Sequence, residues 1–133
     1  MDSKQNLYYA FGQIAYALAA ADGAIQKEEK EKLHLIVTNG LKDHILEFDY
    51  SEIIFLMLGK EHVDMKTAYA WGLKQFRLSS QYLSEKMKQD FLAILEKIAE
   101  AFPPLTMDEK QLIEKFSIDL KEIKGDPVFT GEK

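Results

Sequence analysis

The residues best suited to chemistry lie in one short acidic segment, between two stretches that have the periodicity of helices. Asp22 and Gly23 form a tight corner, and Glu28 and Glu29 follow in the expected first turn of the next helix. Asp22, Gly23, Ile25 and Glu29 have the spacing of the second half of an EF-hand calcium loop. Carboxylates at this spacing could bind a hard divalent cation.

The first half of that calcium loop is missing, because Leu18 and Ala20 fall where an EF-hand has its first oxygen ligands. A capped corner explains the same residues. Asp22 can accept backbone hydrogen bonds, Gly23 can adopt positive φ, and acidic residues stabilise a helix N-terminus. The pattern favours a structural corner over a conventional calcium loop and leaves metal binding open.

Other combinations of catalytic residue types are incomplete. Glu31 and His34 have the Glu-x-x-His spacing of di-iron bundles, but those sites need a second such motif and two further glutamates. The sequence has no His-Glu-x-x-His zinc motif, phosphate-binding loop or dinucleotide fingerprint. Ser79 and Ser80 lack the Gly-x-Ser-x-Gly context of a hydrolase nucleophile, and the chain has no cysteine. We therefore expect a protein that is not an enzyme.

Composition and charge narrow the class further. The chain has 133 residues, of which 47% are hydrophobic and 29% charged, and this is typical of one soluble globular domain. A net charge of -5 argues against nucleic-acid binding through bulk charge. The longest apolar run, Ile53–Leu58, is too short to span a bilayer, and the first residues lack the pattern of a signal peptide. We expect a cytoplasmic protein without direct membrane insertion.

Hydrophobic periodicity predicts an all-α single domain of about six or seven helices. The expected helices cover approximately residues 3–21, 27–39, 50–60, 65–78, 81–102 and 107–123, with a further short helix or turn in 41–48. Asp64, Ser80 and the pair Thr106 and Glu109 have the residue types of N-terminal caps. The Ile53–Leu58 run could also be a buried strand, but a helix is favoured because no second strand candidate exists. The domain should span residues 1–124, followed by a coil tail in residues 125–133.

The two ends of the chain carry an internal repeat. A shift of 80 residues aligns positions of similar chemistry, among them Phe11 with Phe91, Ile14 with Ile94, Leu18 with Ile98 and Leu33 with Ile113. After the corner, Glu28 aligns with Asp108 and Glu29 with Glu109. Amphipathic helices match one another easily, so the shared acidic pair is the more informative part of the repeat.

The segment Ala20–Ile25 with Glu28 and Glu29, after an Ala-rich amphipathic helix, resembles the TerB-like family of tellurite-resistance proteins. The resemblance covers most of the chain and implies an all-helical fold of two related halves, with a stress-response role in bacteria. It also implies acidic metal-binding residues near both corners, which are Asp22, Glu28, Glu29, Asp108 and Glu109 in this sequence. The chain departs from the pattern at Phe102–Pro103, which stand where the first copy has Asp22–Gly23.

Two functions therefore stand as predictions. The first is a non-enzymatic, TerB-like stress-response module that binds calcium, magnesium or manganese, since hard cations suit carboxylate ligands, or that binds a protein partner. That partner could itself be associated with a membrane. The alternative is a metal-free helical scaffold for protein–protein interaction. Neither prediction involves nucleic acid.

Overall fold

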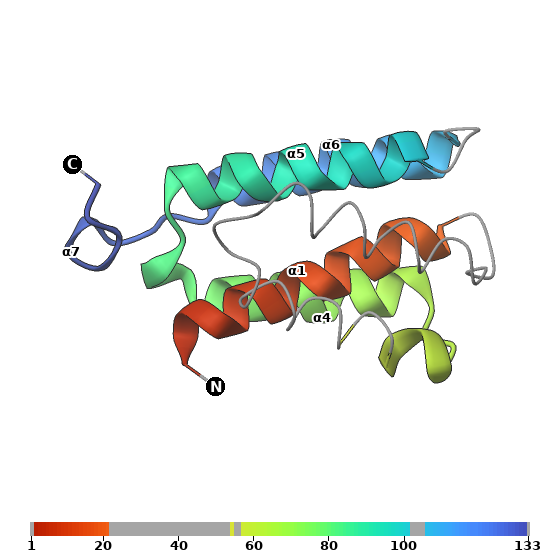
Figure 1. Cartoon of the computed structure of the whole chain (residues 1–133), viewed down its shortest axis with the longest axis horizontal. Coiled ribbons are helices and arrows are strands. Elements are labelled where there is room, and N and C mark those ends of the chain that lie inside the picture. Colours follow the sequence, from red (N-terminus) through yellow and green to blue (C-terminus); the bar gives the residue numbers. More distant parts are fainter. Residues whose placement is uncertain (1, 22–53, 55–56, 102–105, 133) are drawn as a thin grey trace.

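The computed structural model describes residues 2–21, 54, 57–101 and 106–132 of the chain. Its elements, in chain order, are α1 (Ser3–Ala20), α4 (Met65–Leu78), the 3₁₀ helix η2 (Ser80–Tyr82), α5 (Glu85–Ala101), α6 (Met107–Glu122) and α7 (Pro127–Thr130). Figure 1 shows that α1 and α5 run in one direction, and that α4 and α6 run in the other. No strand occurs among the described residues, and the predicted all-α fold is confirmed.

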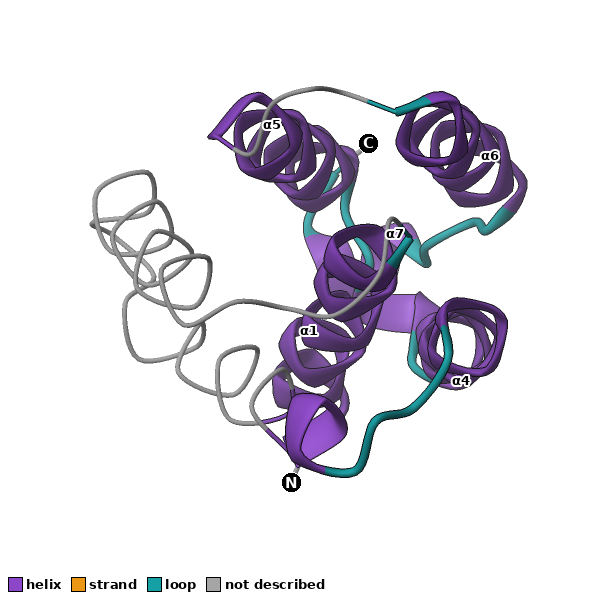
Figure 2. Cartoon of the chain, turned by 90° about the vertical axis from the view of Figure 1, so that its right-hand side faces the viewer, coloured by secondary structure: helices purple, strands orange, loops and turns teal. Residues whose placement is uncertain are grey.

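Helix α1 is the central element of the described structure, with contacts to α4, α5 and α6. It begins after Asp2, which forms a capping box with Gln5. Its buried residues are not confined to one stripe and comprise Leu7, Tyr8 and every residue from Ala10 to Leu18. A helix buried on all sides belongs to the interior of a bundle. Figure 2 shows α4 and α6 on the same side of this central helix.

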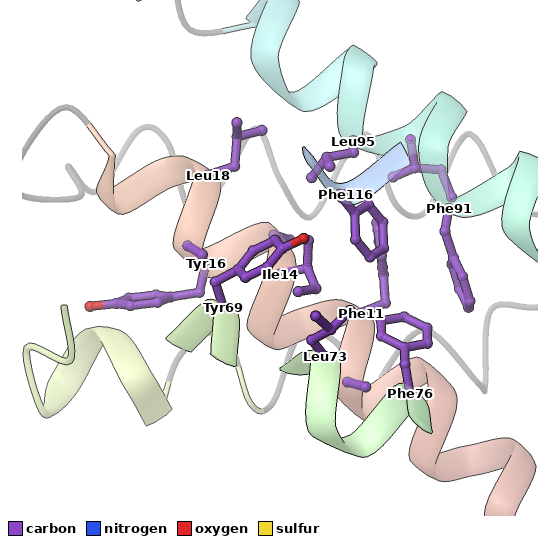
Figure 3. Close-up of a cluster of buried hydrophobic side chains, with 14 of the residues drawn as sticks. Phe11, Ile14, Tyr16, Leu18, Tyr69, Leu73, Phe76, Phe91, Leu95 and Phe116 are labelled. Atoms are coloured by element: carbon purple, nitrogen blue, oxygen red, sulfur yellow. The ribbon is translucent and has the colours of Figure 1, made fainter. Parts of the chain in front are cut away.

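Aromatic rings from four helices join the core around α1 (Figure 3). Phe11 and Phe91 stack with their ring centroids 4.8 Å apart and their planes 14° from parallel. Phe76 lies 5.6 Å from Phe91 and 5.6 Å from Phe116, which extends the cluster from α4 to α6. The stacked pair consists of two residues that the internal repeat aligns. Their contact brings α1 and α5 together at equivalent positions.

Helix α4 packs closely along α1 because of a glycine. A Cβ atom at Gly72 would lie 2.9 Å from Cδ1 of Ile14 and 3.1 Å from the carbonyl oxygen of Ala10. The helix begins after Asp64, whose carboxylate accepts a hydrogen bond of 2.7 Å from the Thr67 amide, so the predicted cap is confirmed. Hydrogen bonds from the Thr67 backbone and hydroxyl lower the pKa of Asp64.

The start of α5 differs from the sequence prediction. Ser80 is not its cap, because Ser80 begins η2 and the α-helix starts only at Glu85. Two other side chains accept hydrogen bonds from the first backbone amides of α5. The Ser84 hydroxyl accepts a hydrogen bond of 3.1 Å from the Met87 amide, and the Glu132 carboxylate accepts one of 2.8 Å from the Glu85 amide. The turn of 3₁₀ helix thus moves the cap four residues along the chain.

The prediction of a coil tail in residues 125–133 is wrong over Pro127–Thr130, which form α7. Asp126 caps this helical turn through the Val128 amide, and Gly131 ends it with a φ of 76°. Proline and glycine indicated coil in the sequence, but proline is also favoured at the first position of a helix and glycine after its end. Figure 1 shows α7 at the end of the bundle where α5 begins.

The described residues also bear on the Ile53–Leu58 segment. Ile54 and residues 57–60 have helical backbone, which supports the helix prediction over the strand. Ile54 and Leu58 are buried, but Met57 is 50% exposed, so the segment is not buried on every side. The predicted helix at 27–39 and the Phe102–Pro103 pair lie outside the described residues.

Candidate functional site

The sequence-predicted metal ligands can be placed only in the second half of the chain. Asp22, Glu28 and Glu29 lie outside the described residues. Asp108 and Glu109 occupy the first turn of α6, where their side chains have different environments. Asp108 is exposed, whereas Glu109 is only 3% exposed. The two neighbouring carboxylates therefore do not share one surface.

Glu109 has a structural role at the start of α6. Its Oε1 accepts hydrogen bonds from the amide and the hydroxyl of Thr106, at 3.3 and 3.1 Å, and the Glu109 amide donates to the Thr106 hydroxyl at 3.1 Å. The predicted capping box is confirmed. In the part of the chain that the structure describes, no three His, Asp or Glu side chains are grouped so that they could hold a metal ion.

The structure contains a different candidate site, a pocket of about 510 Å³ between α4 and α6, here called the α4–α6 pocket. It arises because both helices pack on α1 but have few close backbone contacts with each other. Its walls are largely apolar. The residues that line it are Met65, Lys66, Tyr69, Ala70, Leu73 and Arg77 of α4, and Asp108, Gln111, Leu112 and Lys115 of α6.

Tyr69 links the two walls of the α4–α6 pocket. Its hydroxyl donates a hydrogen bond of 2.5 Å to Oδ2 of Asp119, across from α4 to α6. The Lys115 ammonium lies 3.0 Å from the same carboxylate oxygen and 4.8 Å from the centroid of the Tyr69 ring. The Tyr69 ring also meets Phe116 edge-on. This cluster fixes the separation of the two helices.

Burial and the neighbouring charge set the protonation states in this cluster. Burial raises the pKa of Tyr69, and the hydrogen bond to Asp119 together with its negative charge raises that pKa further. Burial also acts to raise the pKa of Asp119, but hydrogen bonds from Tyr69 and Lys115 outweigh it, so the pKa is lowered. At neutral pH the tyrosine is protonated and the aspartate is ionised. The pair therefore suits a stable cross-link between helices better than proton transfer.

The mouth of the α4–α6 pocket is basic. Lys66, Arg77 and Lys115 contribute three positive charges and Asp108 one negative charge, and the Lys115 charge is paired with Asp119 just outside the lining. The chain as a whole has a net charge of -5. The local charge around the pocket is therefore opposite in sign to that of the whole protein. An apolar recess with charged groups at its edge can bind a ligand that is both apolar and charged.

The α4–α6 pocket was not predicted from the sequence. Tyr69 is buried and Met65 packs partly buried against the core, and both also line the recess. Two signals in the sequence could have indicated the pocket. Lys66 and Arg77 flank the apolar face of α4, and Lys115 and Asp119 lie four residues apart on α6. Their relevance depends on which helix lies next to α4, and local periodicity does not provide that information.

No protein-family model, curated protein or solved structure matches the chain. The fold and the site define this protein as an all-α domain with an amphiphilic pocket. Membership of the TerB-like family stays a prediction from the segment Ala20–Ile25 and the acidic residues after it. None of the helices in the described ranges is long and apolar enough to cross a bilayer.

Proposed function

We propose that this chain is a non-enzymatic helical binding module that recognises a protein partner through the α4–α6 pocket. The observation that carries the proposal is the pocket itself, a largely apolar recess of about 510 Å³ with a charged mouth. Its volume falls in the range of about 300 to 1,000 Å³ that is typical of ligand sites. The proposal corresponds to the interaction scaffold that the sequence left open as an alternative.

The chemistry of the lining residues supports binding rather than catalysis. The Tyr69 hydroxyl already donates a hydrogen bond to Asp119, and its raised pKa makes it a poor acid or base near neutral pH. Lys115 is engaged with the same carboxylate. The remaining charged groups of the lining, Lys66, Arg77 and Asp108, are exposed at the mouth and suit recognition of a charged partner.

A selection of peptides tests the proposal. Peptides that tile the proteome of the source organism are displayed, and binders are selected separately on three proteins: the wild type, Ala70→Trp and Ala93→Trp. Ala70 is exposed and lines the α4–α6 pocket, so an indole at this position fills the recess without displacing the core. Ala93 is likewise an exposed alanine, on α5 and outside the lining, and serves as the matched control. Circular dichroism of each variant checks that it is folded.

The proposal predicts a set of peptides that bind the wild-type protein and Ala93→Trp but are lost on Ala70→Trp. If no enriched peptide distinguishes the two tryptophan variants, the α4–α6 pocket is not a protein-binding site and the proposal is wrong. A cytoplasmic location, and an association of the partner with a membrane, remain predictions from the sequence.

The acidic corner favours a second function, the binding of a divalent cation in a TerB-like stress-response module. Asp22 and Glu29 would supply oxygen ligands, with Glu28 and Asp108 as further candidates, and calcium, magnesium or manganese would suit them. The test is an amide NMR titration of metal-stripped protein with each ion. Saturable changes over residues 22–29 that vanish in Asp22→Ala/Glu29→Ala would support a site, and no change at millimolar metal would exclude it.

A further inference from the structure

We infer that the α4–α6 pocket receives an amphipathic helix of the partner, with apolar side chains along one face and acidic side chains beside them. The inference rests on the proposed function and extends it, because it specifies the shape and the charge of the ligand. Three features of the pocket support it: its extent along α4, the spacing of its apolar side chains and the sign of the charges at its mouth.

The extent of the pocket suits a helix. On α4 the lining residues run from Met65 to Arg77, which corresponds to about 18 Å at about 1.5 Å per residue. On α6 they run from Asp108 to Lys115, about 10 Å along that helix. Because α4 and α6 run in the same direction (Figure 1), the recess follows both axes for several turns. A ligand helix of about three turns would match the length of the α4 wall.

The apolar side chains of the α4 wall have the spacing of a helix-packing ridge. Met65, Tyr69 and Leu73 follow one another at intervals of four residues, and Leu112 faces them from α6. Rows of this kind fit into the grooves of a neighbouring helix. Ala70 adds a small exposed side chain to the same wall, where a larger anchor residue of the partner can enter. Helices bound in grooves commonly use such anchors at intervals of three and four residues.

The charges at the mouth select an acidic ligand. Lys66 and Arg77 stand near the two ends of the α4 wall, and Lys115 stands on the opposite wall. Acidic side chains beside the apolar face of a ligand helix could pair with Lys66 and Arg77, whereas Lys115 is already paired with Asp119. Complementary charge of this kind speeds association and excludes partners of the wrong sign more than it adds affinity.

The positions of the polar groups in the α4–α6 pocket fit a helical ligand better than a small amphiphilic molecule. The Tyr69 hydroxyl already donates a hydrogen bond to Asp119, a residue outside the lining. Lys66 and Arg77 remain exposed to solvent. A buried headgroup would need directed polar partners inside the recess, whereas the flanks of a helix need charges at its edge.

The test uses three designed peptides of about 14 residues, the length that covers the α4 wall with a short margin. The acidic peptide carries leucines at helical spacing and glutamates beside them. The basic peptide replaces each glutamate with lysine, and the third has the composition of the acidic peptide with its leucines spread around the helix. Affinities are measured by fluorescence anisotropy, with sodium laurate as a small amphiphilic probe measured by calorimetry.

Charge reversals locate the contact. Lys66→Glu/Arg77→Glu reverses two charges of the pocket mouth, and Lys97→Glu/Lys121→Glu reverses two exposed lysines outside the lining with the same change in net charge. The inference predicts that the acidic peptide binds best, and that the first double variant weakens it about tenfold or more. The control variant should change its affinity less than about twofold.

The outcomes separate the inference from the proposed function. If the two double variants weaken the acidic peptide equally, or if the basic peptide or the leucine-spread peptide binds as well as the acidic one, the acidic-helix inference is wrong. Saturable binding of laurate without binding of any designed peptide also overturns the acidic-helix inference. The proposed function still stands in those cases if the displayed peptides depend on Ala70, and it falls only if they do not.

Discussion

Replacing Tyr69 with phenylalanine should weaken the link between α4 and α6 while leaving the packing of the ring intact. The substitution removes only the hydroxyl that donates to Asp119 at 2.5 Å. The ring keeps its edge-on contact with Phe116 and its position under the Lys115 ammonium. The expected loss of stability is therefore that of one hydrogen bond to a charged acceptor rather than that of a cavity.

The magnitude follows from the burial of the two partners. Hydrogen bonds to charged groups contribute about 1.5 to 3 kcal/mol. The Tyr69 residue is 8% exposed and the Asp119 side chain 14% exposed, so water can replace the lost donor only in part. Lys115 still pairs with the carboxylate. We expect Tyr69→Phe to lower the free energy of unfolding at neutral pH by about 2 kcal/mol.

The effect should depend on pH at both ends of the range. The pKa of Asp119 is lowered in the folded state, so its contribution is present above the ordinary pKa of about 4 and is lost as the pH falls through the folded value. The pKa of Tyr69 is raised, so its contribution is present below the ordinary pKa of about 10 and is lost as the pH rises further. The difference between wild type and Tyr69→Phe should be largest from about pH 5 to 9.

Urea unfolding of the wild type, Tyr69→Phe, Asp119→Asn and the double variant provides the assay. The double-mutant cycle should give a coupling energy of about 1 to 2 kcal/mol between the two residues. A coupling within about 0.3 kcal/mol of zero would refute the reasoning, because the hydrogen bond would then contribute nothing to stability. A difference that stays constant from acid to neutral pH would contradict the assigned role of Asp119.

Three further predictions concern the packing and the capping of the helices. Gly72→Ala should destabilise the protein by about 1 kcal/mol in thermal melts, because a Cβ 3.1 Å from the Ala10 carbonyl oxygen would push the α1 backbone away by more than the better helix propensity of alanine offsets, and an unchanged melting temperature would contradict the close approach of α1 and α4. Thr106→Ala should cost about 1 kcal/mol in urea unfolding through loss of the α6 cap, and Thr106→Ser should restore most of it. Glu132→Ala should accelerate hydrogen exchange of the Glu85 amide, because it removes the oxygen that accepts the hydrogen bond from this amide, and unchanged exchange would show that the tail does not cap α5.

The sequence predicted the helices well where a start signal coincided with a periodic apolar stripe. Asp64 before α4, and Thr106 with Glu109 at α6, are such cases, and both caps are confirmed. Prediction failed where two signals competed within a few residues. Ser80 and Ser84 are both plausible caps by type, and only the intervening η2 turn decides for Ser84.

The tail shows a second limit of local patterns. Pro127 and Gly131 mark the two ends of α7, although the same residue types are common in coil. What holds the short helix is non-local: the Asp126 amide donates to the Gln81 carbonyl at 3.1 Å, and Phe129 packs on Tyr82 with centroids 5.1 Å apart. Contacts between segments so far apart in the chain cannot be inferred from the spacing of residues within the tail.

The candidate site was missed for the same physical reason. The internal repeat drew attention to acidic positions, and of those in the described residues Glu109 is engaged in a cap while Asp108 lies at the mouth of the pocket. A pocket depends on how far apart two helices stand. Here the separation of α4 and α6 is fixed by α1 and by the bond between Tyr69 and Asp119, which lie 50 residues apart in the chain.

The most direct test of the central claim is a leucine-methyl NMR titration of the wild-type protein with the tightest peptide from the display selection. The methyl groups of Leu73 and Leu112 line the α4–α6 pocket, whereas those of Leu83 and Leu95 are buried outside its lining. The account predicts saturable shifts of Leu73 and Leu112, with Leu83 and Leu95 unmoved, and loss of these shifts in Ala70→Trp. Saturable binding without any shift at Leu73 or Leu112 would place the partner elsewhere and contradict the account.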